Sequence, residues 1–177
     1  MEIFFVRHTS VAVPAGYAYG QTDVPLSDSF EEEAANVKRE IENLDFDEVW
    51  SSPFTRCLRL SDYCGFPTPK KDDRLKEINF GEWEMKSWTE LSSDPRLELW
   101  FKDWIHIQIP KGESFLDQYN RVSDFLDDIR KSDKARVCVF AHGGVLTCAR
   151  VYAGEYSLEE AFKHVPSYGA VVKIVLE

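Results

Sequence analysis

The chain has 177 residues, a length that is typical of one domain. Its composition, 44% hydrophobic and 29% charged, is that of an ordinary globular protein. Asp and Glu outnumber Lys and Arg by 31 to 21, and the resulting net charge of −10 argues against nucleic-acid binding and against docking on an anionic membrane. A small anion stays possible as a ligand, because a few cations in a cleft can override the overall sign.

The N-terminal apolar run at residues 3–6 is too short for a signal peptide or a membrane span, so we expect a cytoplasmic protein. No two cysteines have C-x-x-C spacing, which argues against a zinc or redox site. In a reducing cytoplasm we expect all four to be free, buried thiols: Cys57, Cys64, Cys138 and Cys148.

In chain order, the first predicted elements are a strand and a helix. The apolar run gives a strand over residues 2–6. Ser29 and Glu32 have the spacing of a capping box, which predicts the start of a helix. Apolar residues three and four apart then continue this helix over residues 30–44.

The next predicted pair is a strand over residues 48–51 and a helix over residues 53–64. Ser52 is a good N-cap and Pro53 a good first helical residue. Arg56 then lies in the first turn of this helix, where the helix dipole disfavours a cation.

Residues 67–110 hold four of the five tryptophans and only short helical stretches, such as residues 94–104 with Pro95 near the start. We interpret this segment as an insertion that folds over one end of the sheet and covers the active-site end. It would belong to the single domain formed by residues 1–177.

The last part of the chain completes the pattern. Ser114 is a plausible N-cap for an amphipathic helix over residues 115–129. A strand over 136–141, a helix over 144–153 and a strand over 170–176 follow. Alternating strands and helices, with strands that lack a clean polar face, predict a three-layer α/β/α sandwich with a mostly parallel central sheet.

Polar residues follow three of the predicted strands. They are Arg7 and His8, then Arg56, then His142 with Gly143. In an open α/β sheet, ligands bind beyond the carboxyl ends of the strands, so these residues are expected to meet. Each alone also fits a simpler role, as a surface pair, an ion pair with a carboxylate or a capping histidine. Together they predict an anion site.

A phosphoryl group is the anion that suits these residues. Arginine binds phosphoryl oxygens through a planar fork, and phosphoryl transfer needs little beyond positioning and charge neutralisation. The sequence contains no H-x-x-x-H and no P-loop motif, so we expect no metal and no cofactor. A histidine would be the nucleophile, because no cysteine lies in a phosphate-binding loop.

Six motifs, in order and at suitable spacing, resemble the histidine phosphatase superfamily, which has the phosphoglycerate-mutase-like fold. They lie at residues 6–9, 19–27, 51–57, 75–84, 112–114 and 141–144 (VRHT, YGQTDVPLS, SSPFTRC, LKEINFGEWE, GES and AHGG). The resemblance covers the whole chain.

The resemblance implies a role for each matched residue. His8 would attack phosphorus and form a phosphohistidine. Arg7, Arg56 and His142 would hold the phosphoryl oxygens. Glu77 would be the general acid and then the base, with Glu82 and Glu84 as weaker candidates in the same motif.

Three positions depart from the family pattern: Thr9 replaces the usual Gly, Pro14 an Asn found in many members, and Met85 the Gly of W-E-G members. The loop at residues 14–26 is most similar to α-ribazole phosphatases. We therefore expect substrate contacts from Tyr19, Gly20 and Gln21.

The predicted function is that of a metal-independent phosphomonoesterase acting on a small phosphorylated metabolite, with α-ribazole 5′-phosphate of cobalamin biosynthesis as the leading substrate. The alternatives are a broad-specificity or sugar-phosphate phosphatase, a phosphoglycerate mutase and a non-catalytic phosphate-binding relative. Family mutases carry a longer C-terminal tail, whereas this chain ends after the strand at 170–176, so hydrolysis is favoured. His106 and His164 are expected to be solvent-facing or structural.

Overall fold

A five-stranded sheet forms the centre of the computed structural model, which describes residues 1–177. In spatial order β3-β2-β4-β1-β5, the strands are Lys70–Lys71, Glu48–Ser51, Arg136–Ala141, Glu2–Arg7 and Val171–Val175. The first four are parallel, and β5 runs antiparallel to β1 at one edge. The prediction of a mostly parallel sheet is confirmed, and the C-terminal strand is its antiparallel member.

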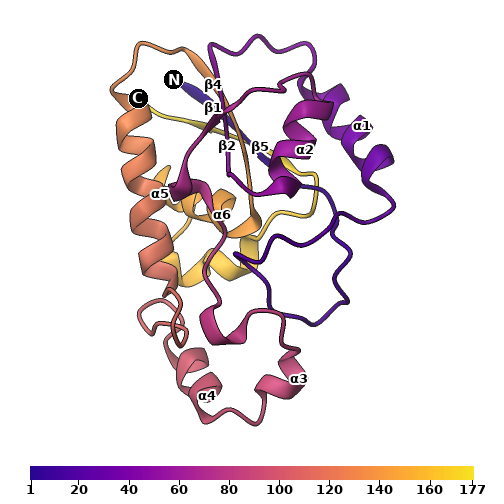
Figure 1. Ribbon diagram of the computed structural model, residues 1–177. Helices are drawn as coiled ribbons and strands as arrows, with labels where there is room; N and C mark the ends of the chain where they lie inside the picture. The colour runs from indigo at the N-terminus through magenta and orange to yellow at the C-terminus, as the bar shows by residue number, and fades with distance from the viewer.

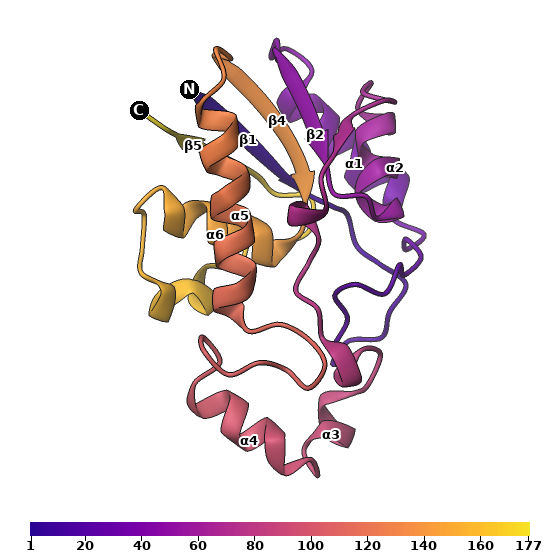
Figure 2. The same ribbon diagram turned by 60° about the vertical axis from the view of Figure 1, so that its left-hand side comes forward.

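Helices cover both faces of the sheet (Figures 1 and 2). On one face, α1 (Phe30–Ile41) and α2 (Thr55–Tyr63) bury a core of 10 residues. On the other, α5 (Phe115–Arg130) and α6 (Gly143–Tyr152) bury a core of 18 residues. Alternate residues of β4 enter the two cores, which explains why its sequence is apolar throughout. The three-layer prediction is confirmed.

The helix caps follow the sequence only in part. At α5, Ser114 and Asp117 form a reciprocal capping box, as the position of Ser114 predicted. At α1 the predicted capping box is wrong, because the Ser29 hydroxyl donates to Glu33 Oε1 at 2.6 Å and leaves the helix amides alone. This helix also ends at Ile41, three residues earlier than predicted.

The start of α2 differs from the prediction in a way that matters for the site. The helix begins at Thr55, so Pro53 is not its first residue and Ser52 is not its N-cap. Its first amide, Thr55 N–H, donates instead to Asp23 Oδ1 at 3.1 Å. A carboxylate from a distant loop thus caps α2. Arg56 still lies in the first turn.

Residues 67–110 contain two different parts. Lys70–Lys71 form β3 and belong to the sheet, which the sequence pattern did not show. Beyond the carboxyl ends of the strands lies what we call the aromatic lobe, residues 81–109, which holds α3 (Trp88–Leu91) and α4 (Pro95–Lys102), seen at the bottom of Figures 1 and 2. It packs around a third small core, centred on Trp83 and Trp100.

The remaining minor predictions agree with the structure. All four cysteines are free and buried. His106 and His164 are exposed, the first beside Asp103 and the second stacked on Tyr156. None of the helices combines the length and the apolar character needed to cross a membrane.

Trp83 is the test of the aromatic lobe's core, because it is fully buried and packs edge-on against Trp100 with ring centroids 5.8 Å apart. We expect Trp83→Ala to lower the free energy of unfolding by about 3–5 kcal/mol, measured by urea unfolding with circular dichroism. Phe101→Ala is the matched control, since Phe101 is an aromatic of the same lobe with 61% of its side chain exposed. Its effect should stay within about 0.5 kcal/mol, and equal losses for both variants would contradict the assignment of the core.

Candidate active site

Three strand ends bring the predicted residues together. His8 follows β1 and His142 follows β4, its neighbour in the sheet, so their rings lie 5.2 Å apart between centroids. Arg56 comes from the helix that follows β2, on the other side of β4. The location agrees with the expectation that ligands of open α/β sheets bind beyond the carboxyl ends of the strands.

His8 is buried, with 2% of its surface exposed. Its Nδ1 lies 2.8 Å from the Thr9 carbonyl oxygen. A carbonyl can only accept, so Nδ1 carries the proton and Nε2 keeps its lone pair. Burial, together with the charges of Arg56 and Arg7, lowers the pKa of His8 to about 3. The ring is therefore neutral at pH 7, which is the form that a nucleophile needs.

Thr9, which stands where the family has Gly, is buried beside His8. Its φ angle is not positive, so the backbone does not require a glycine there. The departure from the family pattern is sterically accommodated.

His142 caps α6 and is fully buried. Its Nε2 lies 2.8 Å from the hydroxyl oxygen of Ser52, the residue that the sequence assigned to a helix cap. Burial, the positive charge of Arg56 and neighbouring His8 hold the pKa of His142 well below its ordinary value.

Arg56 is fully buried, and its guanidinium lies among carbonyl groups. It donates to the carbonyl oxygens of Thr22, at 2.9 Å, and Gly20. Its nearest carboxylate oxygen, on Asp23, is 4.0 Å away and belongs to a half-exposed side chain that already caps α2. An ion pair with a carboxylate therefore does not explain the burial of this charge.

Arg7 completes the cationic side of the site. Its Nη1 donates to the Pro166 carbonyl, and the guanidinium carbon lies 4.0 Å from the centre of the Tyr168 ring. The Nε atoms of Arg7 and Arg56 are both buried and have no hydrogen-bond partner. Two charged donors in this state are costly unless they can bind an anion.

Glu77 lies beside the start of α6. Its Oε2 accepts from the Gly144 amide at 3.1 Å, and its Oε1 accepts from Gln118 Nε2 at 2.8 Å. A Cβ at Gly144 would overlap Glu77 Oε1, while one at Gly143 would press on the guanidinium of Arg7 at 3.1 Å. The two adjacent glycines thus let the carboxylate and the arginine approach the same helix end. The Gly144 amide at this helix end is occupied by Glu77.

The two other carboxylates of this motif are already committed elsewhere. Glu84 accepts hydrogen bonds from the amides of Gly20 and Gln21 and therefore holds the loop that surrounds Arg56. Glu82 is paired with Arg96 and Lys111 on the surface. Of the three carboxylates, Glu77 is the one that binds the start of α6, the helix that follows His142.

The loop residues proposed to contact substrate are arranged around the arginines. Gly20 has no room for a side chain, because a Cβ would overlap the Ile78 carbonyl, and its own carbonyl accepts from Arg56. Gln21 Nε2 donates to the backbone oxygen of Glu77 at 3.2 Å, so it is used within the protein. The Tyr19 hydroxyl lies 2.6 Å from that of Tyr168. Burial raises the pKa of Tyr19, and its phenol stays neutral.

Sequence reasoning missed Tyr168, whose ring centre lies 5.6 Å from that of His8. It is 149 residues from Tyr19 along the chain and belongs to none of the quoted motifs, so no local signal marks it.

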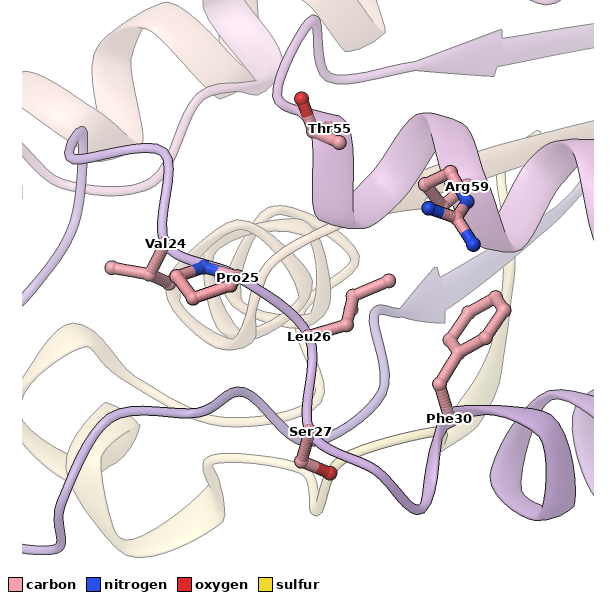
Figure 3. Close-up of a pocket in the computed structure, with 7 residues that line it drawn as sticks. All are labelled: Val24, Pro25, Leu26, Ser27, Phe30, Thr55 and Arg59. Carbon is pink, nitrogen blue, oxygen red and sulfur yellow. The ribbon is translucent and has the colours of Figure 1, made fainter.

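A small apolar pocket of about 170 Å³ opens directly beside Glu77. Seven of its ten lining residues are hydrophobic, and none is Lys or Arg. Those that carry the argument below are Phe80, Trp100, Phe115 and Phe162. A larger hollow of about 420 Å³ lies between α2 and the loop before α1, but no candidate residue lines it (Figure 3). Of these two hollows, the apolar pocket is the one lined by candidate site residues, Tyr19 and Glu77.

No group of three or more His, Cys, Asp or Glu side chains has an arrangement that could hold a metal ion. The groups that could neutralise a phosphoryl charge at this site are the side chains of Arg7 and Arg56.

Comparison with known proteins places this geometry in a family. A protein of Hydrogenobacter thermophilus, provisionally named phosphoserine phosphatase 2, is 31% identical over 152 residues, which cover 82% of this chain and 74% of the relative. A protein of Erwinia tasmaniensis, provisionally named phosphoglycerate mutase GpmB, is 28% identical over 82% of this chain and 71% of the relative.

Among solved structures, the alpha-ribazole phosphatase from Shigella flexneri superimposes with a TM-score of 0.90, at 22% identity, over 100% of this chain and 91% of its own. At that identity the match shows a shared fold. The model of the histidine phosphatase superfamily (branch 1) matches residues 3–177, nearly the full length. The chain therefore belongs to the histidine phosphatase superfamily.

Proposed function

We propose that this protein is a metal-independent phosphomonoesterase that works through a phosphohistidine on His8. One observation carries the proposal: a neutral, buried His8 with its Nε2 free lies beside two arginines, Arg7 and the fully buried Arg56, whose buried Nε donors have no partner. A nucleophile and a pair of preorganised cations are the two requirements of phosphoryl transfer to an enzyme.

The proposed first step forms one bond and breaks one. The lone pair of His8 Nε2 attacks phosphorus, the bond from phosphorus to the leaving oxygen breaks, and Glu77, protonated at this stage, gives its proton to that oxygen. Arg7 and Arg56 stabilise the charge that spreads over the three other oxygens. His142, buried against Arg56, gains a proton most readily when the dianion is present, since a nearby negative charge raises its pKa.

The second step returns the protein to its starting state. Glu77, now a carboxylate, accepts a proton from water as the water oxygen attacks phosphorus. The bond from phosphorus to His8 Nε2 breaks, and inorganic phosphate leaves. Gln118 and the Gly144 amide, which bind both oxygens of Glu77, orient this group in the two half-reactions.

For the substrate we propose α-ribazole 5′-phosphate. Its leaving group carries a flat apolar ring system, which suits a small pocket walled by Phe80, Trp100, Phe115 and Phe162. Phosphoserine and 3-phosphoglycerate both carry a carboxylate on the carbon adjacent to the phosphate-bearing carbon. Burying that carboxylate in a pocket without Lys or Arg would cost several kcal/mol. The resemblance of the loop at residues 14–26 to α-ribazole phosphatases favours the same substrate.

The first prediction concerns His8. His8→Ala should lower kcat by on the order of 10⁴-fold or more, because the covalent route is lost. Acid-quenched wild-type protein incubated with ³²P-labelled substrate should show a phosphoenzyme that is labile in acid and stable in base. Both results should be unchanged when EDTA is present. Full activity of the His8 variant would exclude the proposed nucleophile.

The second prediction concerns Glu77, with Glu82 of the same motif as its control. Glu77→Gln should reduce kcat/KM by roughly 10²-fold or more for an alkyl phosphate, whose alkoxide needs a proton to leave. The loss should be much smaller for p-nitrophenyl phosphate, which leaves as a stable phenolate. Glu82→Gln, a change to an exposed ion-paired carboxylate of the same motif, is the control and should leave both rates unchanged. Equal losses on the two substrates would point to a different acid.

The third prediction concerns specificity. Measured by phosphate release, kcat/KM for α-ribazole 5′-phosphate should exceed that for phosphoserine and 3-phosphoglycerate by about a hundredfold or more. Phe162→Ala, which opens one wall of the pocket, should reduce this preference with little effect on inorganic phosphate as an inhibitor. A rate on phosphoserine equal to that on α-ribazole 5′-phosphate would reject this substrate. Conversion of 3-phosphoglycerate to its 2-isomer would identify a mutase.

A further inference from the structure

The Gly112-Glu113-Ser114 motif has no place in the chemistry described so far, yet its glutamate forms one of the best-defined ion pairs in the molecule. Arg121, on α5, binds the Glu113 carboxylate through two hydrogen bonds, Nε to Oε1 at 2.8 Å and Nη2 to Oε2 at 3.0 Å. Both side chains are largely buried. A paired fork of this kind is rigid and specific in direction.

The same guanidinium also holds the backbone of the segment that carries Glu77. Its Nη1 donates to the carbonyl oxygens of Arg74, at 2.7 Å, and Lys76, at 2.6 Å. Its Nη2 donates to the carbonyl oxygen of Glu77 itself at 3.1 Å. All five N–H groups of Arg121 are therefore used, two on Glu113 and three on this segment.

Glu113 contacts the segment on its far side. Its Oε2 accepts from the Asn79 amide at 2.8 Å, and its own amide donates to the Asn79 carbonyl at 3.0 Å. The backbone around Glu77 is thus held at two points. Arg121 binds the carbonyl oxygen of Glu77, and Glu113 binds the amide of Asn79, two residues later. Residues 77–80 are neither helix nor strand, so no ladder of backbone hydrogen bonds fixes them.

Resting on the proposed function, we infer that Glu113 and Arg121 are positioning residues that set where the Glu77 carboxylate meets the leaving oxygen. The helix α5 supplies both halves of this control: Arg121 holds the Glu77 backbone, and Gln118, one turn earlier, holds its side chain. A displacement of about 1 Å at an acid can cost roughly 10²-fold in rate, so the pair acts on the chemistry without touching the substrate.

The test compares two leaving groups, and this comparison separates a loss of positioning from a general loss of stability. Arg121→Gln should reduce kcat/KM for an alkyl phosphate by about 30-fold and for p-nitrophenyl phosphate by less than about threefold. Arg121→Lys should recover little, because an ammonium cannot make the fork and three carbonyl contacts at once. Arg74→Gln is the matched control, since the Arg74 side chain binds Asp72 on the same segment and Asp128 on α5, and has no hydrogen bond to Glu77.

A double variant supplies the second readout. If Arg121 acts through Glu77, adding Arg121→Gln to Glu77→Gln should cause no further loss on the alkyl phosphate. Should the Arg121 variant fail to fold by circular dichroism, Glu113→Gln replaces it, because the amide keeps the size of the side chain and weakens the fork. Equal losses on the two phosphates, or losses that multiply in the double variant, would overturn the inference.

The outcome for the proposed function is read separately. Turnover that survives His8→Ala rejects the phosphohistidine mechanism itself. Turnover that depends on His8 but is indifferent to Arg121→Gln and Glu113→Gln rejects only the positioning role of this pair.

Discussion

The burial of the Arg56 guanidinium is the constraint on which much of this structure depends. A charge removed from water without a paired carboxylate must be compensated by other polar groups. Here the compensation comes from the carbonyls of Gly20 and Thr22, and the loop that presents them is held by Glu84. Gly20 cannot be replaced there for lack of space. Burial and, after it, the charge of Arg56 lower the pKa of both neighbouring histidines, so this buried cation acts on the proposed nucleophile as well as on the candidate phosphoryl site.

The two layers of helices contribute different chemistry to the candidate site. The α2 side supplies the cation, through Arg56 and the loop around it. The opposite side supplies the acid, because α5 and the first residues of α6 bind the backbone and both carboxylate oxygens of Glu77. The strands β1 and β4, side by side in the sheet, place the two histidines between these halves. The sheet and its two helix layers thus place the proposed acid and a cation at one candidate phosphoryl site.

The aromatic lobe contributes to the apolar pocket on which the proposed substrate preference rests. Trp100 from the lobe, Phe115 from α5 and Phe162 from the segment after α6 meet in the apolar pocket beside Glu77. The superfamily members most similar in sequence include proteins named for phosphoserine and phosphoglycerate, both of which are carboxylates. An uncharged pocket is poorly suited to such groups, since it offers no partner for the charge. In this chain, the candidate catalytic residues and the apolar pocket are supplied largely by separate parts of the chain.

The sequence alone predicts a feature of this protein when the residues that determine the feature lie close together in the chain. Hydrophobic periodicity and turn residues are local, so four of the five strands, the covered sheet and the cap at Ser114 followed from them, whereas the short β3 did not. The positions of His8, Arg56 and His142 followed from strand ends, whereas Glu77 needed the family motif, since one Glu among many carries no local mark. Contacts between distant segments were out of reach. Asp23 rather than Ser52 caps α2, and Ser52 instead lies against His142. The hydroxyl of Tyr168 lies against that of Tyr19, and Arg121 binds the backbone of Glu77. Each of these pairs exists only because folding places residues far apart in the chain within hydrogen-bond distance, and no propensity or period in either segment encodes the other.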